Sequence, residues 1–553
     1  MTRLAWLVLL GFSAGYSQIR FEEIAQKAGI HFQLKNGARG QFHQVELMPG
    51  GVAVLDYNND GCLDIYFTNG AALPSLRKTG PEFHNRLYRN NCDLTFTDVT
   101  EKAGVAGDGY SMGVAAADYD NDGYTDIFVA GVNRNILYRN RGDGTFEDVT
   151  QKAGLSGIDP KYGKMWATSA GWFDYNNDGR LDLFVSNYVR WDPRTEPHCG
   201  SGDQRLYCHP DNYHGLPNQL FRNNGDGTFT DVSLDSGIGK HVGKGMGVAF
   251  ADANGDGYPD VFVANDSVRN FLFENQRDGT FKEAGLEYCV ALREDGAAIA
   301  GMGADFRDVD NDGLPDIFVT GMINDTFLLF RNLGKGKLFA DETMHSRLAV
   351  ETRQLTGWSA GIYDLDNDSW KDLFSANSHF PRLGQYLGRD SGLPNTVYRN
   401  LGNGRFEDVS SSAGKDLQQA GMHRGAAFGD FDNDGKIDVV VSVLNGAAKL
   451  FHNTSEGKNH WIAVRLIGSK SNRDGLGALV QVTLPDGNKL YNQATTSIGY
   501  ASSSEPFVRF GLGKVDRATE IEVRWPGGGT QRLENVKADQ LIIVRETDQV
   551  KPR

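Results

Sequence analysis

Seven short segments rich in aspartate constrain this chain more than any other feature of its sequence. One of them, residues 118–126, reads DYDNDGYTD and places aspartates at positions 1, 3, 5 and 9. Relatives of it begin at six other aspartates, and we number the seven "aspartate loops" in chain order. Hard oxygen ligands crowded on a short loop suit calcium, which takes about six to eight oxygens in flexible geometry. The pattern therefore predicts a calcium ion in each loop, up to seven in all.

The predicted ligands are side-chain oxygens at positions 1, 3, 5 and 9 and a backbone carbonyl at position 7, where the residue type varies freely. Position 1 is Asp56, Asp118, Asp174, Asp252, Asp308, Asp364 and Asp430. Position 3 is Asn58, Asp120, Asn176, Asn254, Asp310, Asp366 and Asp432. Position 5 is Asp60, Asp122, Asp178, Asp256, Asp312, Asp368 and Asp434. Position 7 is Cys62, Tyr124, Arg180, Tyr258, Leu314, Trp370 and Lys436. Position 9 is Asp64, Asp126, Asp182, Asp260, Asp316, Asp372 and Asp438.

The two remaining informative positions concern the backbone. Position 4 is asparagine in six loops and Gly255 in the fourth, and both residue types tolerate the left-handed conformation that a loop wrapped around an ion needs. Position 6 is glycine except at Ser369, so the sixth loop fits the pattern least well.

Two other interpretations of the loops are weaker. An EF-hand needs a glutamate at position 12 and a helix on each side, whereas these loops run into strand-like segments such as Asp-Ile-Phe-Val. Simple acidic turns would not repeat one ligand pattern seven times. We therefore expect a calcium loop between two β-strands.

The formal charge of −15 argues against nucleic acid as a partner. Seven divalent ions would neutralise most of this charge. The sequence therefore predicts that calcium is part of the fold, and that a chelator lowers the melting temperature.

The first 17 residues resemble a secretory leader. Arg3 supplies a positive end, residues 4–12 an apolar run, and residues 15–17 a small-x-small cleavage site. No second apolar stretch approaches the length of a transmembrane helix, about 18 residues. We expect an exported protein, secreted, periplasmic or extracellular.

Residues 18–455 form a repeat array. Three of the intervals between successive first aspartates are 56 residues, which is the length of a propeller blade with its loops. Each unit has a strand of small residues, the aspartate loop, a bulky strand, an LYRN-type strand, and a Gly-Asp-Gly-Thr-type turn into a fourth strand. The small residues suit inner strands that converge on an axis. The array therefore predicts an all-β, seven-bladed propeller.

The two ends of the array predict how the ring closes. The seventh unit stops after its third strand, residues 450–453, and residues 21–29 match the fourth-strand segment 146–154 almost residue for residue. We expect the N-terminal strand to complete the last blade, which leaves no open sheet edge.

Loop, LYRN strand and hairpin recur together, and in this combination the repeats resemble the FG-GAP/VCBS repeats of integrin α-subunit propellers and of many secreted bacterial proteins. The resemblance covers about 435 residues, residues 18–455.

Three connections between second and third strands are enlarged: Gly70–Asn85, Asn187–Pro217 and Asn377–Pro394. In an up-and-down blade they lie on one face, opposite the aspartate loops, where a protein or carbohydrate ligand is expected. Aromatic and histidine side chains there offer sugar stacking, with a packed insert as the alternative. These residues are Tyr188, Trp191, His198, Tyr207, Tyr213, His214, His379 and Tyr386.

The five cysteines leave alternatives open. In an exported protein we expect a Cys199–Cys208 disulfide, and zinc binding by the nearby Cys/His set is the alternative. A Cys62–Cys92 bridge is compatible with loops on one face. Cys289 would then remain, as a buried thiol.

Residues 456–546 change character. Alternating apolar runs and the turn Pro485–Asn488 predict a small β-sandwich-like domain. Residues 471–478, 499–500 and 510–513 resemble the ASPIC/UnbV domain, and the whole architecture is similar to the cartilage acidic protein family. The resemblance implies fold and location more than chemistry. Residues 547–553 form a polar tail.

Nothing in the sequence indicates a catalyst. We find no G-x-S-x-G, H-E-x-x-H, phosphate-loop or dinucleotide motif. Asp305, in an expected inner strand, could face the channel with Arg307 or His423. We expect an exported calcium-binding scaffold that binds protein or glycan without catalysis. The alternatives are a calcium-dependent polysaccharide lyase or hydrolase, and an assembly factor for another exported enzyme.

Overall fold

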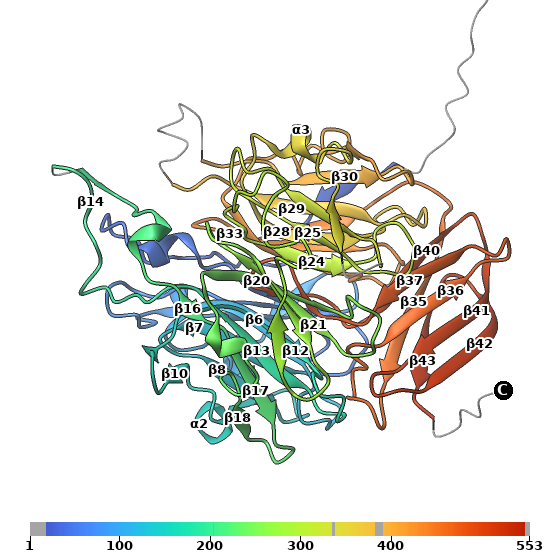
Figure 1. Cartoon of the computed structure of the whole chain (residues 1–553), viewed down its shortest axis with the longest axis horizontal. Coiled ribbons are helices and arrows are strands. Elements are labelled where there is room, and N and C mark those ends of the chain that lie inside the picture. Colours follow the sequence, from blue (N-terminus) through green and yellow to red (C-terminus); the bar gives the residue numbers. More distant parts are fainter. Residues whose placement is uncertain (1–17, 203, 335–337, 382–390, 548–553) are drawn as a thin grey trace, which may run out of the picture.

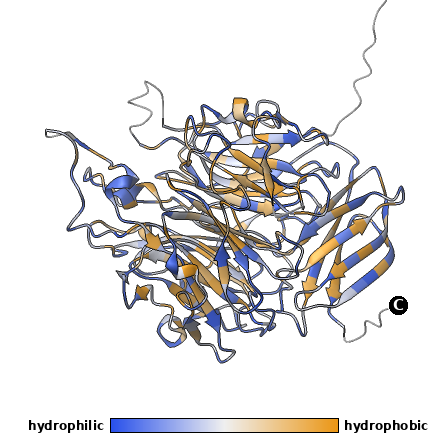
Figure 2. Ribbon diagram, in the orientation of Figure 1, coloured by the Kyte–Doolittle hydropathy of each residue, from blue (hydrophilic) through white to orange (hydrophobic). Residues whose placement is uncertain are grey.

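The computed structural model describes residues 18–202, 204–334, 338–381 and 391–547. The expected leader, Tyr386 and most of the expected tail lie outside these residues. The chain is nearly all β, as the sequence predicts. Apolar residues concentrate in the strands of both parts of the molecule (Figure 2). Among the described residues, no helix is long and apolar enough to cross a membrane.

Seven sheets make up the repeat region within the described residues, and each has four antiparallel strands from one repeat, with the N-terminal strand completing the last. The first sheet contains β2 (Val52–Leu55), β3 (Asp64–Phe67), β4 (Arg86–Asn90) and β5 (Phe96–Asp98). The second contains β6 (Tyr110–Ala117), β7 (Asp126–Val132), β8 (Ile136–Asn140) and β9 (Phe146–Asp148). The third contains β12 (Ala167–Phe173), β13 (Asp182–Asn187), β17 (Gln219–Asn223) and β18 (Phe229–Asp231). The fourth contains β20 (Gly245–Ala251), β21 (Asp260–Asn265), β22 (Phe271–Asn275) and β23 (Phe281–Glu283).

The remaining three sheets follow the same order. The fifth contains β24 (Ala304–Arg307), β25 (Asp316–Val319), β26 (Leu328–Asn332) and β27 (Phe339–Asp341). The sixth contains β28 (Gly357–Tyr363), β29 (Asp372–Asn377), β30 (Thr396–Asn400) and β31 (Phe406–Asp408). The seventh contains β32 (His423–Gly429), β33 (Asp438–Val443), β34 (Lys449–Asn453) and the N-terminal β1 (Phe21–Glu23).

The inner strand of each sheet contacts the inner strands of its two neighbours, and β32 contacts β2, so the sheets form a closed ring. Small residues allow this approach. A Cβ added at Gly113 would lie 2.3 Å from the carbonyl oxygen of Thr168 in the next inner strand. The predicted closure is confirmed: β1 pairs antiparallel with β34, with Phe21 opposite Asn453 and Glu23 opposite Phe451.

Short elements decorate the connections. In the described part of the chain, three of these elements are α-helices: α1 (Thr100–Ala103), α2 (Thr150–Ala153) and α3 (Leu348–Thr352). The 3-10 helices are η1 (Gln44–Leu47), η2 (Pro81–Phe83), η3 (Pro210–Asn212) and η4 (Ile238–Lys240). Small hairpins and bridges are β10 (Ile158–Asp159) with β11 (Gly163–Lys164), β14 (Cys199–Ser201) with β15 (Gln204–Leu206), and β16 (Leu216–Pro217) with β19 (Val242–Gly243).

The C-terminal domain contains two sheets that share a core. One is β40-β35-β43 and the other β37-β36-β41-β42. Their bounds are β35 (His460–Ile467), β36 (Leu479–Thr483), β37 (Lys489–Gln493), β40 (Val508–Gly513), β41 (Arg517–Arg524), β42 (Thr530–Lys537) and β43 (Gln540–Arg545). Buried residues of both sheets, such as Val464 and Val523, belong to one apolar cluster that continues into the second and third propeller sheets through Trp172.

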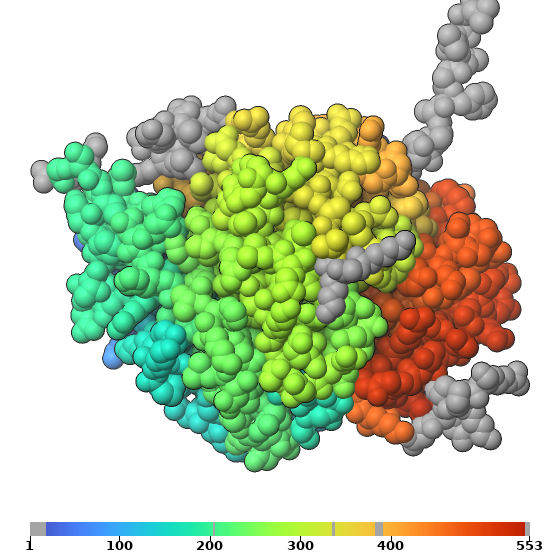
Figure 3. All heavy atoms as spheres, in the orientation of Figure 1, coloured from blue at the N-terminus to red at the C-terminus, as the bar shows by residue number. Residues whose placement is uncertain are grey.

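The C-terminal domain and the enlarged connections lie on opposite sides of the propeller. In Figure 1 the strands β35–β37 and β40–β43 lie on the right and the insert with β14 projects on the left. Figure 3 shows the C-terminal domain, in red, packed directly against the propeller. We call the side that carries the described residues of segments 68–85, 188–218, 378–381 and 391–395 the loop face.

A hairpin from the C-terminal domain enters the centre of the propeller. Its strands β38 (Ser497–Ile498) and β39 (Ser502–Ser503) extend the first sheet, with Ser503 parallel to Ala53 of β2. We call residues 494–505 the plug. At its tip Tyr500 is 0 % exposed and donates a hydrogen bond to the carbonyl of Met48 at 2.6 Å. The sequence did not indicate this insertion.

Candidate metal centres

Each aspartate loop joins the first and second strands of a sheet and is organised by its own carboxylates. The position 1 aspartate accepts two backbone N–H groups from the other side of the loop. In loop 2, Asp118 accepts from Asp122 at 3.0 Å and from Gly123 at 2.7 Å. The same bonds from positions 5 and 6 recur in loops 1, 3, 4, 6 and 7, and in loop 5 positions 4 and 6 donate instead.

The position 9 aspartate begins the second strand and is almost fully buried in all seven loops. Asp126 accepts from the backbone N–H of Tyr119, at position 2, and of Asn140, in the third strand. All seven loops repeat this pair of bonds. Position 9 therefore fixes the loop to two strands of its own sheet.

The backbone conformation at positions 4 and 6 agrees with the residue types found there. All position 4 residues adopt left-handed backbone, from φ 56° at Asn177 to φ 73° at Gly255. Position 6 also has positive φ in every loop, including φ 84° at Ser369. Because a non-glycine residue is strained there, Ser369 marks the sixth loop as the exception that the sequence predicts.

Side-chain oxygens at positions 1, 3 and 5 lie close together, and some of them have no hydrogen-bond donor among the described residues. In loop 2, ligand atoms of Asp118, Asp120 and Asp122 lie within 4.8 Å of one another. Asp120 Oδ1, Asp310 Oδ1 and both carboxylate oxygens of Asp366 are buried without a hydrogen-bond partner among the described residues. Buried acceptors of this kind are costly unless something satisfies them. The donor set, all hard oxygen, fits a divalent cation such as calcium.

Arginines of the third strand reach into three loops. Arg139 pairs with Asp120 at 2.5 Å and Asp122 at 2.8 Å. Arg331 and Arg399 make the equivalent contacts in loops 5 and 6. A guanidinium placed between position 3 and position 5 carboxylates shows that this part of loops 2, 5 and 6 attracts positive charge.

Burial raises the pKa of many of the loop carboxylates. It raises the pKa of Asp118 to about 8, with repulsion from Asp474 as the next cause, and the pKa of Asp174 to about 6. The pKa of every position 9 aspartate is raised as well, again chiefly by burial. A nearby cation has the opposite effect and favours the ionised form.

Several position 7 side chains cover the adjacent hairpin, whereas Arg180 and Lys436 pair with the position 5 carboxylates Asp178 and Asp434, at 2.5 and 2.9 Å. A Cβ added to a turn glycine shows what each side chain covers: Gly142 would meet the Tyr124 ring at 2.7 Å, and Gly402 the Trp370 ring at 2.7 Å. In these two loops the position 7 side chain therefore packs on the hairpin between the third and fourth strands. This placement agrees with a role for the backbone, not the side chain, at position 7.

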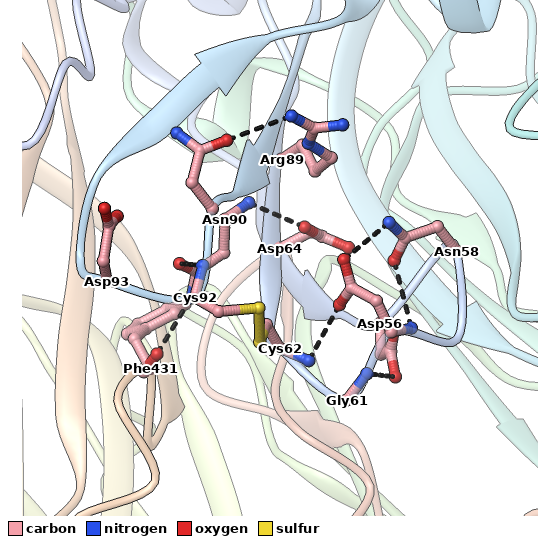
Figure 4. Close-up of a disulfide and its surroundings, with 12 residues drawn as sticks. Asp56, Asn58, Gly61, Cys62, Asp64, Arg89, Asn90, Cys92, Asp93 and Phe431 are labelled. Atoms are coloured by element: carbon pink, nitrogen blue, oxygen red, sulfur yellow. Dashed lines mark hydrogen bonds between the residues drawn. A yellow bond between two sulfur atoms is a disulfide. The ribbon is translucent and has the colours of Figure 1, made fainter.

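Loop 1 replaces this packing contact by a covalent bond. Cys62, at position 7, forms a disulfide with Cys92 of the adjacent hairpin, with S–S 2.00 Å (Figure 4). Cys199 is joined to Cys208 across the β14–β15 hairpin, with S–S 2.06 Å. The alternative of zinc binding by this pair does not fit a disulfide. The expectation of a buried Cys289 is wrong: its side chain is exposed, because it follows the outer strand β23 on the rim.

In two repeats, a residue other than arginine occupies the third-strand position that Arg139 holds beside loop 2. Glu274 occupies the position in loop 4, and Asn254 donates to it at 3.4 Å. His452 occupies it in loop 7, 3.0 Å from Asp438 and 3.9 Å from Asp432. We did not single out either residue from the sequence. The signal was present, since FLFEN and LFHN depart from the LYRN pattern.

The sequence also did not indicate the role of a ring of asparagines, although they are the last residues of the LYRN-type strands. The last residue of each third strand donates its side-chain N–H to the position 2 carbonyl of the preceding loop, as Asn140 does to Tyr57 at 2.7 Å. The donors are Asn90, Asn140, Asn223, Asn275, Asn332, Asn400 and Asn453. Asn90 bonds Phe431 of the seventh sheet and so closes the ring (Figure 4).

The C-terminal domain rests on the aspartate loops. Asp474 accepts from the backbone N–H of Asp118 at 2.8 Å. Arg509, which pairs with Glu505, also donates to Asp430 at 3.1 Å. Trp461 covers Gly435 of loop 7 so closely that a Cβ there would lie 2.0 Å from the indole. Any ion held by loops 2 or 7 would therefore also act on this interdomain contact.

The loop face is more closely packed than its aromatic composition suggested. Tyr188, Trp191, Tyr213 and His379 are at most 8 % exposed. Glu196 explains part of this burial, because it accepts hydrogen bonds from Trp191 Nε1 and the Tyr213 hydroxyl. Sugar stacking by these four side chains is therefore wrong as an expectation, and a packed insert is what the structure has. His198 and His214 are exposed and Tyr207 is half-buried.

Asp305 lies in β24 and is fully buried. It pairs with Arg307 at 3.2 Å and accepts from the backbone N–H of Ile362 at 2.8 Å. His423 instead contacts the carbonyl of Asn377 at 3.1 Å. The expected pairing with Arg307 is present, whereas an open channel beside Asp305 is wrong, because the plug fills the centre of the ring.

Two family models match the chain. The model described as FG-GAP-like repeat matches residues 56–129, 118–185, 200–263, 252–319, 308–375 and 364–441. The model described as ASPIC and UnbV matches residues 468–551. The first covers all seven aspartate loops, and the second covers most of the C-terminal domain, including the plug.

Similar proteins extend over most of the chain. Cartilage acidic protein 1 of Homo sapiens is 24% identical over 495 residues, covering 86% of this chain and 69% of its own. That of Xenopus tropicalis is 25% identical over 502 residues, covering 86% and 70%. A solved lectin of Agrocybe aegerita, described as recognising non-reducing terminal N-acetylglucosamine, is 17% identical with a TM-score of 0.40, over 72% of this chain and 86% of its own. On its repeats and its last domain, this chain belongs to the FG-GAP-like repeat family and carries an ASPIC and UnbV domain.

Proposed function

We propose that this protein is an exported, calcium-stabilised scaffold that binds a protein or glycan on its loop face without catalysing a reaction. The observation that carries the proposal is the seven-fold repetition of one carboxylate geometry, with buried position 3 oxygens that lack partners in loops 2, 5 and 6. Calcium would be held by the carboxylates and amide oxygens at positions 1, 3, 5 and 9 and by the position 7 carbonyl. When bound it would supply positive charge that cancels the repulsion among them.

The chain's own residues prepare these sites. Backbone N–H groups hold the position 1 and position 9 carboxylates in place before any ion arrives, so little ordering remains to be done on binding. Arg139, Arg331 and Arg399 offset part of the charge in loops 2, 5 and 6 and would have to move aside or share the carboxylates.

Two features support export. The structure joins Cys62 to Cys92 and Cys199 to Cys208, and disulfides persist mainly in oxidising compartments. The residues that resemble a leader precede the first described strand. Millimolar calcium outside the cytoplasm would then be enough to load sites of moderate affinity.

Metal counting tests the calcium proposal. We expect about seven calcium ions per chain by elemental analysis after dialysis against calcium, and a large fall in melting temperature with a chelator. The variant Asp120→Asn/Asp122→Asn should lose about one ion and should unfold at a lower temperature. The matched control Asp143→Asn changes an exposed aspartate of the adjacent hairpin and should retain the full count. An unchanged melting temperature in chelator contradicts the proposal.

Binding tests concern the loop face. The calcium-loaded chain is incubated with a glycan array and with a secretome extract, beside the variant Leu206→Asp, which alters an exposed residue of the β14–β15 insert. Leu234→Asp, at an exposed position between β18 and η4, is the control. Capture that Leu206→Asp abolishes and Leu234→Asp retains supports the scaffold. New unsaturated sugar ends absorbing in the ultraviolet would instead indicate a lyase.

A further inference from the structure

A cavity of about 340 Å³ lies on the loop face, at the mouth of the propeller channel. Its walls come from the connections of several sheets, among them η1, the β14–β15 insert and the segments after β21, β25 and β29. We call it the channel-mouth pocket. Its volume lies within the range of small-ligand sites, about 300–1,000 Å³.

The lining is mainly apolar and rich in sulfur and aromatic groups. The main apolar side chains are Met48, Met246, Met302, Met322, Trp358 and Phe380. Phe380 meets the Trp358 ring edge-on, with centroids 5.6 Å apart. Methionine is flexible and polarisable and makes favourable contacts with aromatic rings. Walls of this composition suit a flat apolar group, such as an aromatic ring.

The plug closes the inner end of the pocket. Tyr500 belongs to the same apolar cluster as Met48, Met246, Met302 and Trp358, and it is fully buried. Its ring meets Trp358 edge-on at 5.4 Å. A ligand that enters from the loop face therefore stops against side chains supported by the plug and does not pass through the ring.

Hydrogen-bond acceptors line the polar side of the pocket. Gln44 is 3 % exposed and Asp266 is 7 % exposed. Gln44 Nε2 donates to the Tyr188 hydroxyl at 3.5 Å, and that hydroxyl donates to Asp266 Oδ2 at 2.5 Å. This chain of bonds fixes the amide orientation and leaves Gln44 Oε1 buried without a partner among the described residues.

Asp266 also retains capacity to bind. Its two oxygens accept from Tyr188 and Ser267, and an ionised carboxylate has about four acceptor sites. Lys244 and His209 are the basic groups near Asp266, and both contact Asp211 instead, at 2.8 Å and 3.4 Å. The pocket therefore offers a buried carboxylate with acceptor sites to spare and a buried amide oxygen without a partner among the described residues.

We propose that the channel-mouth pocket binds an aromatic group that carries an ammonium donor, with the ring among the methionines and the ammonium at Asp266 and Gln44. This site specifies the chemistry of the loop-face ligand and so rests on the proposed function. An arylalkylamine of indole size represents the chemistry.

One feature of the structure would favour an anionic ligand over a cationic one. Arg424 is fully buried and covers the Trp358 ring at 3.8 Å. Its guanidinium donates to the carbonyls of Leu47 and His423 and to Ser378 Oγ. If Arg424 instead of Asp266 set the ligand's charge, an anionic ligand would bind better than a cationic one.

Three probes that share the indole ring system and differ in charge distinguish a cation-binding from an anion-binding pocket: tryptamine, indole and indole-3-acetate. Each is titrated by calorimetry into the full calcium-loaded chain at pH 8. We expect tryptamine to bind most tightly and indole-3-acetate least. Equal affinities, tighter binding of indole-3-acetate, or no heat at millimolar concentrations of any probe would each overturn the proposal.

Variants locate the site. Asp266→Asn should weaken tryptamine binding about tenfold or more and leave indole binding nearly unchanged, because it removes a charge-assisted hydrogen bond. Met322→Trp should block all three probes by filling the partly buried side of the pocket. Met344→Trp places the same ring at a position 69 % exposed and should bind as the unmodified chain does. Thermal unfolding of each variant checks the fold, and if Asp266→Asn fails to fold, Gln44→Leu replaces it with the same expected direction.

The pocket and the scaffold proposal can fail separately. Tight tryptamine binding with no loop-face partner in the secretome or glycan experiments keeps the pocket and refutes the scaffold. Partner capture that depends on Leu206 but is not displaced by tryptamine, with no probe binding, keeps the scaffold and refutes the pocket.

Discussion

Single asparagines connect neighbouring sheets at the aspartate loops. Asn59, Asn121, Asn177, Asn311 and Asn367, all at position 4, donate to the position 6 carbonyl of the next loop. The residue type thus does two things: it accepts left-handed backbone, and it bonds the next sheet. Glycine can do only the first, so loop 4, with Gly255, lacks this bond to loop 5.

Exchanging asparagine and glycine at position 4 tests how much the bond between loops contributes to the free energy of unfolding. Asn367→Gly should lower the free energy of unfolding by about 1–3 kcal/mol, because it leaves the buried Gly435 carbonyl without its donor. Gly255→Asn should raise it by about 0.5–1 kcal/mol, since φ 73° suits asparagine and an added Cβ meets no atom within 4 Å. Urea unfolding with calcium present measures both. Equal effects in the same direction would contradict a bond between loops.

His423 provides a pH dependence at the residue scale. Burial lowers its pKa from 6.5 to about 4, and nearby Lys449 and Arg424 act in the same direction. The folded chain therefore binds fewer protons than the unfolded chain between these values, so the contribution to stability is present above pH 6.5 and is lost as the pH falls towards 4. The shift corresponds to about 3 kcal/mol at most.

The variant His423→Asn should reduce the loss of stability between pH 6.5 and pH 4. Urea unfolding at four or five pH values in this range measures the slope. The control is His345→Asn, an exposed histidine 59 % accessible, whose slope should equal that of the unmodified chain. A slope for His423→Asn equal to that of the unmodified chain would refute the assignment.

At the scale of the element, loop 1 differs from the other loops in being tied covalently to its hairpin. The Cys62–Cys92 bond joins the β2–β3 loop to the β4–β5 hairpin, where other sheets place a position 7 side chain over a turn glycine. It restrains one of the three loops whose position 3 is asparagine, the other two being loops 3 and 4.

Removing this bridge should destabilise the chain and loop 1 in particular. We expect Cys62→Ser/Cys92→Ser to lower the free energy of unfolding by about 2–4 kcal/mol and to release one calcium ion at lower chelator concentration than the unmodified chain. The matched control, Cys199→Ser/Cys208→Ser, alters a projecting hairpin and should have a smaller effect. Identical losses in the two double variants would contradict a special role for loop 1.

At the scale of the whole molecule, the plug joins the two domains into one structure. Residues 494–505 contact inner strands around the ring: Ala501 accepts from Val114 at 3.1 Å, Gly499 pairs with Ala304, and Ser504 accepts from Phe428 at 3.0 Å. The apolar core of the C-terminal domain also continues into the second and third sheets. The two domains should therefore unfold together.

Truncating Tyr500 tests this coupling. Tyr500→Ala should cost about 3–5 kcal/mol and separate calorimetric unfolding into two transitions, because the tip of the plug loses its apolar contacts. Tyr500→Phe keeps the ring and loses only the bond to Met48, so it should cost about 1–3 kcal/mol and retain a single transition. A single unchanged transition in Tyr500→Ala would show that the plug does not couple the domains.

The sequence by itself determined what depends on local chemistry. Aspartate spacing predicted the loops, asparagine and glycine predicted their left-handed residues, and alternating apolar runs predicted the strands. The match between residues 21–29 and 146–154 predicted ring closure, because a repeated segment carries its pairing partner with it. These features follow from side chains within one repeat.

The tertiary structure alone decided what depends on distant segments. Nothing in residues 494–505 indicates that they fill a channel, since their partners lie in inner strands hundreds of residues away. The burial of Tyr188 and Trp191, the exposure of Cys289 and the pocket between Met48 and Trp358 depend in the same way on how loops from several sheets meet. Local patterns specify an element, but the surroundings of a side chain are set by whichever elements the closed ring brings against it.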